Sequence, residues 1–232
     1  RLYGTGGDDA FFDVVGDGSV NFFFAGYTGS ETELGASGGG LDILTASFSD
    51  DFNVRRLNQF GGTGDQLFNT ADNLRTGFFT AGVFDQVTPG VSGSQKDILI
   101  AYQRSASALD SIAELGTSGD DVVNEVAGVD FQGIAAGSTG GSLFEGSVHG
   151  GGTDWWMASY NVVQPDPTDN DRVLEMAWQI QGGDSRNEAI KSLSATTYGK
   201  LFKLTEVEDG NSRIVQVTPF ALTDGRELSE LP

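Results

Sequence analysis

Short apolar runs, separated by glycine, aspartate and asparagine, dominate the pattern of hydrophobic and polar residues along the chain. These runs predict four β-strands in each of several similar units, and in the second unit the strands are, in order, Val54–Phe60, Leu67–Asp72, Thr76–Phe84 and Asp97–Ser105. Helical periodicity is weak, and the best helical candidate is the short stretch around Asn187–Leu193. The pattern therefore predicts an all-β protein.

The strand pattern repeats along the chain, and Gly-Asp pairs give its register. The aspartates of these pairs are Asp8, Asp65, Asp120 and Asp184, at spacings of 57, 55 and 64 residues. Similar phrases follow in the first three units, namely VNFFFAG, TGFFTAG and FQGIAAG, and then DILTASFS, DILIAYQR and DWWMASYN. We expect one repeat domain, residues 1–232, with units of approximately 1–57, 58–113, 114–177 and 178–232.

Runs such as NFFFAGY are apolar at nearly every position, which is typical of strands covered on both faces. Antiparallel four-stranded sheets reach that state as the blades of a β-propeller, so we predict about four such blades. GDGS at Gly16–Ser19 predicts a tight hairpin between the second and third strands of the first unit. The first residues, RLYGTGG, match the end of a first strand, and the last residues, GRELSELP, lie where another first strand would begin. The two termini are therefore expected to complete one strand between them and to close the ring. The alternatives are a segment of a larger propeller, a β-sandwich or a β-solenoid.

The phrase GG-x-GDD … V … G-x-V-x-x-x-G-x-T … D-x-x-x-A resembles the SBBP-type bacterial β-propeller repeat. The resemblance covers residues 1–165 well and implies a propeller made of repeated blades. It also implies a structural role for the acids Asp42, Asp97 and Asp154. The fourth unit departs from the pattern, because Lys200 and Lys203 enter its apolar strand, and this predicts a capping unit.

Charge and composition exclude several classes of function. The chain has 13 basic and 33 acidic residues, a net charge of −20, which is the wrong sign for a nucleic-acid-binding surface. No apolar run is long enough to cross a bilayer, so we predict no membrane insertion. The absence of cysteine excludes disulfides and thiol chemistry. His149 is the only histidine, and its glycine-rich setting predicts a surface loop rather than a catalytic base.

Acidic turns provide the candidate metal ligands. Aspartate and asparagine oxygens suit Ca²⁺, and the same side chains also cap turns by accepting backbone N–H groups. The candidate calcium ligands are Asp166, Asp169, Asn170 and Asp171 in one acidic loop, and Asp8, Asp9, Asp120 and Asp121 at the repeated corners. No cofactor other than Ca²⁺ is expected.

The paired tryptophans Trp155 and Trp156 are the candidate ligand contacts. On a strand they face opposite sides of the sheet. Both align with apolar positions of the other units, which favours packing between blades. The alternative is that an exposed indole stacks on a sugar ring.

These features predict a non-enzymatic structural or binding module of an exported or cell-surface bacterial protein. Its expected partners are another protein, a second copy of itself, or a glycan, as in assembly or adhesion. No catalytic residue is predicted. The alternative is a carbohydrate-active hydrolase or lyase with carboxylates at the propeller channel, and fold alone does not decide between the two.

Overall fold

The computed structural model describes residues 5–16, 21–30, 40–51, 53–62, 64–86, 95–104, 109–166, 168, 170–196, 198–210 and 212–228. These residues form 15 strands in four antiparallel sheets and no helix. Consistently, no helix among them is long and apolar enough to cross a bilayer. The all-β prediction is confirmed.

Each sheet is a meander of strands that are consecutive in sequence. Sheet 1 consists of β1 (Asp9–Gly16), β2 (Asn21–Thr28), β3 (Asp42–Ser49) and β4 (Val54–Phe60). Sheet 2 consists of β5 (Gln66–Leu74), β6 (Gly77–Gln86), β7 (Gln95–Gln103) and β8 (Ser111–Leu115). Sheet 3 consists of β9 (Asp121–Val129), β10 (Gln132–Thr139), β11 (Asp154–Val163) and β12 (Val173–Gly182). Sheet 4 has three strands, β13 (Asn187–Ala195), β14 (Lys200–Asp209) and β15 (Ser212–Ala221).

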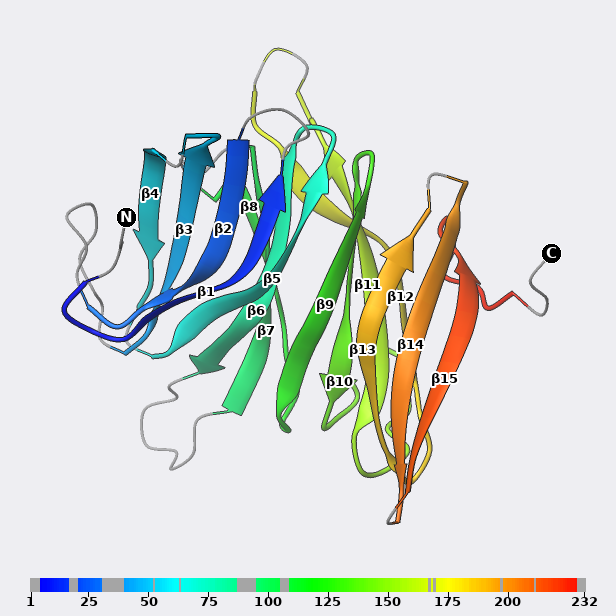
Figure 1. Cartoon of the computed structure of the whole chain (residues 1–232). Helices are drawn as coiled ribbons and strands as arrows, with labels where there is room; N and C mark the ends of the chain where they lie inside the picture. The colour runs from blue at the N-terminus through cyan, green and yellow to red at the C-terminus, as the bar shows by residue number, and fades with distance from the viewer. Residues whose placement is uncertain are drawn as a thin grey trace.

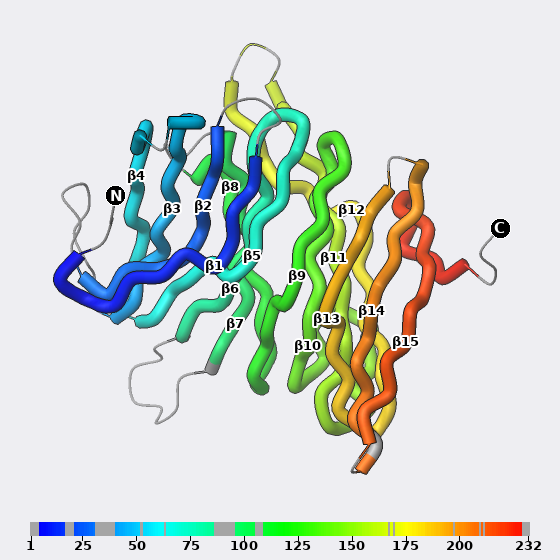
Figure 2. Tube along the Cα trace, in the orientation of Figure 1, coloured from blue at the N-terminus to red at the C-terminus, as the bar shows by residue number. Residues whose placement is uncertain are grey.

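The four sheets stand in a row, each packed against the next (Figures 1 and 2). The first strands of neighbouring sheets contact one another closely, β1 with β5, β5 with β9 and β9 with β13, whereas the outer strands β8 and β12 contact less. Sheets 1 and 4 lie at opposite ends of the row in Figure 1. The structure therefore does not show the closed ring expected from the termini, and the propeller stays a prediction.

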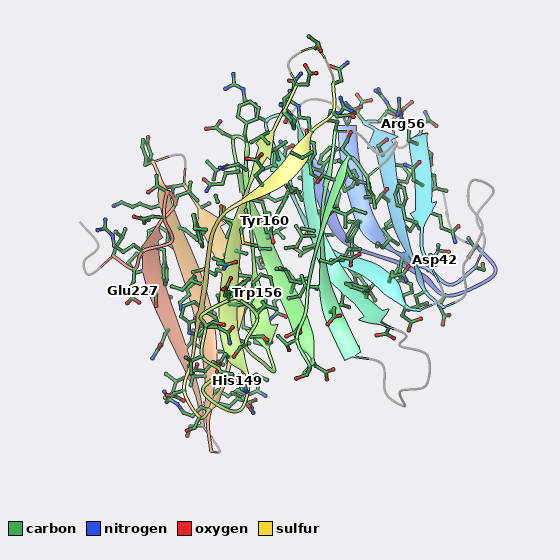
Figure 3. The ribbon with its side chains drawn as sticks, turned by 180° about the vertical axis from the view of Figure 1, so that it is seen from behind. Asp42, Arg56, His149, Trp156, Tyr160 and Glu227 are labelled. Carbon is green, nitrogen blue, oxygen red and sulfur yellow. The ribbon has the colours of Figure 1, made fainter. Side chains whose placement is uncertain are left out.

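Apolar side chains fill the space between successive sheets. Phe23 of sheet 1 stacks on Phe78 of sheet 2, with ring centroids 4.2 Å apart. Trp156 and Tyr160 are buried on β11 in the middle of the row, while Asp42 lies on sheet 1, as Figure 3 shows. Strand β7, which contains the apolar run DILIAY, is buried from Asp97 to Gln103, so the expectation of cover on both faces is confirmed for it. In β2, which contains NFFFAGY, buried residues alternate with partly exposed ones. Strands β3 and β11 are also buried on both faces for most of their length.

A one-residue β-bulge recurs at the same place in every first strand. The bulged residues are Phe12, Asn69, Asn124 and Lys191. In the first three sheets a glycine on the second strand lies opposite this bulge. A Cβ atom at Gly82 would lie only 1.8 Å from the carbonyl oxygen of Leu67. The shared bulge and its glycine support the internal repeat found in the sequence.

Two sequence-based assignments are wrong. Asn187–Leu193 forms part of strand β13, not a helix. Buried Ile190 and Leu193 are three residues apart, because the bulge at Lys191 shifts the strand alternation, and this spacing imitates a helix. Val54–Phe60 is a strand as predicted, but it pairs with β3 as the last strand of sheet 1 instead of opening the next unit.

The predicted hairpin at Gly16–Ser19 falls mostly outside the described residues. The strands on either side of it, β1 and β2, pair as far as Gly16 and Phe22. The segment therefore joins the first and second strands of its sheet, not the second and third as predicted, because the strand expected to open each unit closes the preceding sheet instead.

Candidate functional site: the junctions between sheets

A carboxylate or amide at the start of each first strand closes the turn that precedes the strand. Asp9 accepts hydrogen bonds from the backbone N–H (2.5 Å) and the hydroxyl (2.9 Å) of Thr5. Asp121 accepts the same two bonds from Thr117, and burial raises its pKa. Gln66 and Glu188 hold this position in sheets 2 and 4, each accepting the N–H four residues earlier, at 2.6 Å and 3.3 Å. Sequence reasoning missed these two, because their side chains differ from aspartate.

The other predicted corner acids, Asp8, Asp120 and Asp184, lie inside these turns, and the N–H that Glu188 accepts is that of Asp184. Asp8 and Asp120 are exposed. Asp184, which the sequence aligned with them, instead makes an ion pair with Arg186 at 2.5 Å. Among the described residues, no group of three or more acidic or histidine side chains is placed to hold a metal ion. Calcium at the corners stays a prediction that this geometry does not favour.

The acids at or near the start of the third strands form the junctions between sheets. Asp42, Asp97 and Asp154 are buried, and each packs against the glycine that follows the fourth strand of its sheet, at Gly61, Gly116 and Gly183. No Cβ fits at these glycines, since one at Gly61 would lie 1.7 Å from the Asp42 carboxylate. The aspartate thus lets the chain pass closely from one sheet to the next, a structural role consistent with the resemblance.

A glutamine on the fourth strand pairs with the junction aspartate in two of the three sheets. The Nε2 atom of Gln59 donates to Asp42 at 2.8 Å, and that of Gln181 donates to Asp154 at 3.1 Å. Sheet 2 has Glu114 at the matching place opposite Leu99, and the Glu114 side chain is exposed. Burial raises the pKa of Asp97, and the charges of Asp121 and Glu114 raise it further.

The described residues of the acidic loop between β11 and β12 show no shared ligand set. Asp166 accepts hydrogen bonds from the backbone N–H (2.8 Å) and hydroxyl (2.7 Å) of Thr168, and these bonds lower its pKa. Asn170 and Asp171 are exposed. Asp169 lies outside the described residues. The structure therefore assigns Asp166 a turn-closing role, and the calcium site here stays a prediction.

The paired tryptophans face opposite sides of β11, as predicted. Trp156 is fully buried toward sheet 2, and its Nε1 atom donates to the carbonyl of Val122 at 3.1 Å. Trp155 faces sheet 4, where its ring lies 6.3 Å from that of Phe220. Neighbouring sheets thus cover both indoles, which explains them as packing residues.

Lys203 lies on β14, where the sequence indicates only an interruption of an apolar strand. It is 5% exposed, and its Nζ atom lies 3.0 Å from the centroid of the Trp155 ring and 5.0 Å from that of Phe220. Burial lowers the pKa of Lys203 to about 7, against the opposing charges of Glu227 and Glu188. A buried amine between two aromatic rings is the most strongly perturbed group at the junction of sheets 3 and 4.

His149 lies in the loop before β11, as expected, and its side chain is partly buried. Its Nδ1 atom lies 3.3 Å from the carboxylate of Asp154, which also accepts the N–H of Gly150 at 3.0 Å. The nearby hydroxyl of Ser147 donates to the carbonyl of Phe144 at 2.7 Å. These contacts anchor the loop to the junction of sheets 3 and 4.

Carboxylates on the first strands link neighbouring sheets. Asp13 accepts the N–H of Ala71 at 2.8 Å, and Asp72 accepts the N–H of Gly128 at 2.7 Å. Glu125 of sheet 3 accepts the hydroxyl of Thr70 of sheet 2 at 3.1 Å. Burial raises the pKa of both Asp72 and Glu125. The bulged asparagines add similar links, with Asn69 donating to Val123 and Asn124 to Ile190, each at 2.8 Å.

A polar cavity of about 230 Å³ lies where sheets 3 and 4 meet. Its lining comes from both sheets and comprises Ser138, Thr153, Asn187, Glu188, Ala189, Lys191, Glu206 and Glu208. Arg213 bridges two of the glutamates, at 3.2 Å from Glu206 and 3.6 Å from Glu208. The charges around this cavity are therefore largely paired within the protein.

Comparison with models of known protein families gives no match, and comparison with curated proteins gives no significant match. The resemblance to the SBBP-type repeat accordingly stays a prediction that rests on the residues quoted above.

Proposed function

We propose that the chain is a non-enzymatic module of an exported or cell-surface bacterial protein, and that it acts in protein–protein assembly. One observation carries this proposal: both ends of the row of sheets leave apolar side chains in solvent. Phe12 and Val14 on β1 are 53% and 52% exposed, and Val215 and Val217 on β15 are 59% and 63% exposed. Strand β11, which holds the place of β15 in sheet 3, buries nearly every residue.

Stacked sheets explain why these ends would recruit a partner. A sheet is stable when its apolar face packs against another layer, and the inner sheets of this row pack on both sides. Clustered apolar side chains on a soluble protein commonly mark an interaction site. We propose that the row is an open arc of SBBP-like propeller blades, and that a further sheet supplied by a partner covers its ends.

The carboxylates on the first strands support a structural module over a hydrolase or lyase. A glycosidase needs two carboxyl groups free to reach the sugar. Here Asp13, Asp72 and Glu125 each accept a hydrogen bond from the adjacent sheet. Glycan contact and adhesion through the loops remain parts of the proposal that no particular contact favours.

Sedimentation equilibrium over a range from about 1 to 100 µM tests the proposal, because weak assembly interfaces dissociate in this range. We expect a mass that rises with concentration. The double variant Phe12→Ser/Val14→Ser should weaken association at the sheet 1 end, whereas Val148→Ser, an exposed valine in the β10–β11 loop, should not. Association that is not weakened by substitutions at either end of the row would overturn the proposal. A mass that stays that of a single chain at every concentration, together with no crosslinking between copies, would also overturn it.

A further inference from the structure

We infer that a second copy of this chain pairs with the free edge of β15, joining two copies edge to edge across a two-fold axis at Val215. The inference rests on the assembly role proposed above and names the partner and the surface. Sheets 1, 2 and 3 each have a fourth strand, β4, β8 and β12, beside the third strand. Sheet 4 ends at its third strand, β15, and Figure 1 shows β15 on the outside of the row.

Hydrogen bonds at the end of β15 show which backbone groups face outward. The N–H of Ala221 donates to the carbonyl of Arg226, and the carbonyl of Pro219 accepts the N–H of Leu228, both at 2.8 Å. In an antiparallel strand, alternate residues direct both polar groups to the same side. The outward set therefore continues with Val217, Val215 and Arg213, while the residues between them bond to β14.

The chain protects this edge only at one end. Pro219 has no N–H to offer, and the segment with Glu227 and Leu228 covers the strand beside it; Glu227 is labelled next to the last sheet in Figure 3. Beyond that point Arg213, Val215 and Val217 are exposed. Among the described residues, no backbone hydrogen bond covers the outward groups of these three.

The other outer strands carry features that discourage edge pairing. Arg55 and Arg56 are exposed on β4, β8 has only five residues, and Glu175 is exposed on β12. Charged side chains and short length are the usual protection of sheet edges. The centre of β15 reads Ile-Val-Gln-Val instead, which has high β-propensity and no charge.

The sequence of β15 is complementary to itself in antiparallel pairing. With Val215 opposite its own copy, Arg213 lies opposite Val217 of the second copy, and these three pairs exchange two hydrogen bonds each. This register uses every free outward group and stops short of the segment at Pro219. β15 contains no acidic residue in a chain of net charge −20, so two copies approach here with little repulsion between carboxylates.

Variants of the outward residue at the axis test the pairing. Val215→Pro removes one outward N–H and leaves the bonds to β14, and Val215→Lys adds a charge to an exposed position. The chain has no cysteine, so Val215→Cys introduces a single thiol. In the inferred register the two Cα atoms would be about 5.5 Å apart, within the range of a disulfide. Val148→Cys is the matched control, because Val148 is the more exposed valine at 81%.

We expect the wild-type mass to rise with concentration, Val215→Pro and Val215→Lys to remain single chains at the same concentrations, and Val215→Cys to form a disulfide dimer faster than Val148→Cys. Circular dichroism on both edge variants checks that they fold, and Val215→Lys decides the outcome if the proline variant unfolds. Association that persists in the folded Val215→Lys variant would overturn the edge pairing and leave the assembly role standing. Equal crosslinking of the two cysteine variants would also overturn it.

Discussion

Replacing Lys203 by methionine should stabilise the protein, and the gain should depend on pH. Methionine has a similar length and is apolar, so it fills the space between Trp155 and Phe220 without a charge. Burial lowers the pKa of Lys203 from 10.5 to about 7. At 1.36 kcal/mol for each pKa unit, keeping this lysine protonated costs the folded state about 5 kcal/mol.

The contact with Trp155 offsets part of that cost. A desolvated cation over an indole ring gains about 2 kcal/mol. The expected net gain of Lys203→Met in the free energy of unfolding is therefore about 3 kcal/mol at pH values below the folded-state pKa.

The pH dependence has a definite sign. Between about pH 7 and pH 10.5 the unfolded chain holds a proton on Lys203 that the folded protein does not, so wild-type stability rises with pH across this window. Methionine does not titrate, and the advantage of the variant should shrink as pH increases.

Urea unfolding of both proteins at about pH 6 and about pH 9.5 measures the difference. Lys191→Met, at an exposed position on β13, is the control and should show no such pH-dependent gain. A gain for Lys203→Met that is equal at both pH values would refute the reasoning, as would a loss of stability at the lower pH.

Three further substitutions and one metal titration test the junctions, the bulge, the buried tryptophan and the acidic turns. Glu114→Gln should give Asp97 the amide partner that Asp42 and Asp154 already have, and should raise the free energy of unfolding in urea by about 1 kcal/mol. Burial and acidic neighbours raise the pKa of Asp97, so this gain should grow as pH rises above 3.8 and vanish in acid. Gly82→Ala should cost about 3 kcal/mol, whereas Gly6→Ala, where nothing lies within 4 Å of a Cβ, should cost far less. Trp156→Phe should cost about 2 kcal/mol by thermal unfolding, since two partly buried carbonyls lose the indole N–H. Adding Ca²⁺ to metal-stripped protein should shift the unfolding temperature no more than Mg²⁺ does, and a saturable calcium-specific shift would restore the acidic turns as metal sites.

The strands were largely predictable because each depends on a local pattern. Val54–Phe60 was identified with its observed bounds, and the opposite faces of Trp155 and Trp156 follow from the strand period alone. Which strands pair with one another was harder to predict from the sequence. A strand that follows a short turn looks the same in sequence whether it closes one sheet or opens the next. Only the hydrogen-bonded pairing of β4 with β3 shows that Val54–Phe60 closes sheet 1.

The residues that form the junctions could be predicted only in part from the sequence, since each junction combines residues that are distant along the chain. Glu188 and Asp9 share a role but not a side chain, and the aligned Gly-Asp pair drew attention to Asp184 instead. A lysine inside a strand usually indicates a solvent-facing position. That Lys203 is buried depends on Trp155, which comes from another sheet.

The junction pattern also explains why the end of sheet 4 differs from the other sheets. By strand register, Ile214 holds the place of the junction aspartates Asp42, Asp97 and Asp154, and Ile214 is partly exposed. Without an aspartate there, a following glycine has no carboxylate to pack against. A contact between β15 and a further sheet would therefore lack the aspartate–glycine packing used three times earlier in the row. A contact at this end needs a different geometry, and hydrogen bonding along the outward edge of β15, whose centre carries no charge, is one that its residues permit.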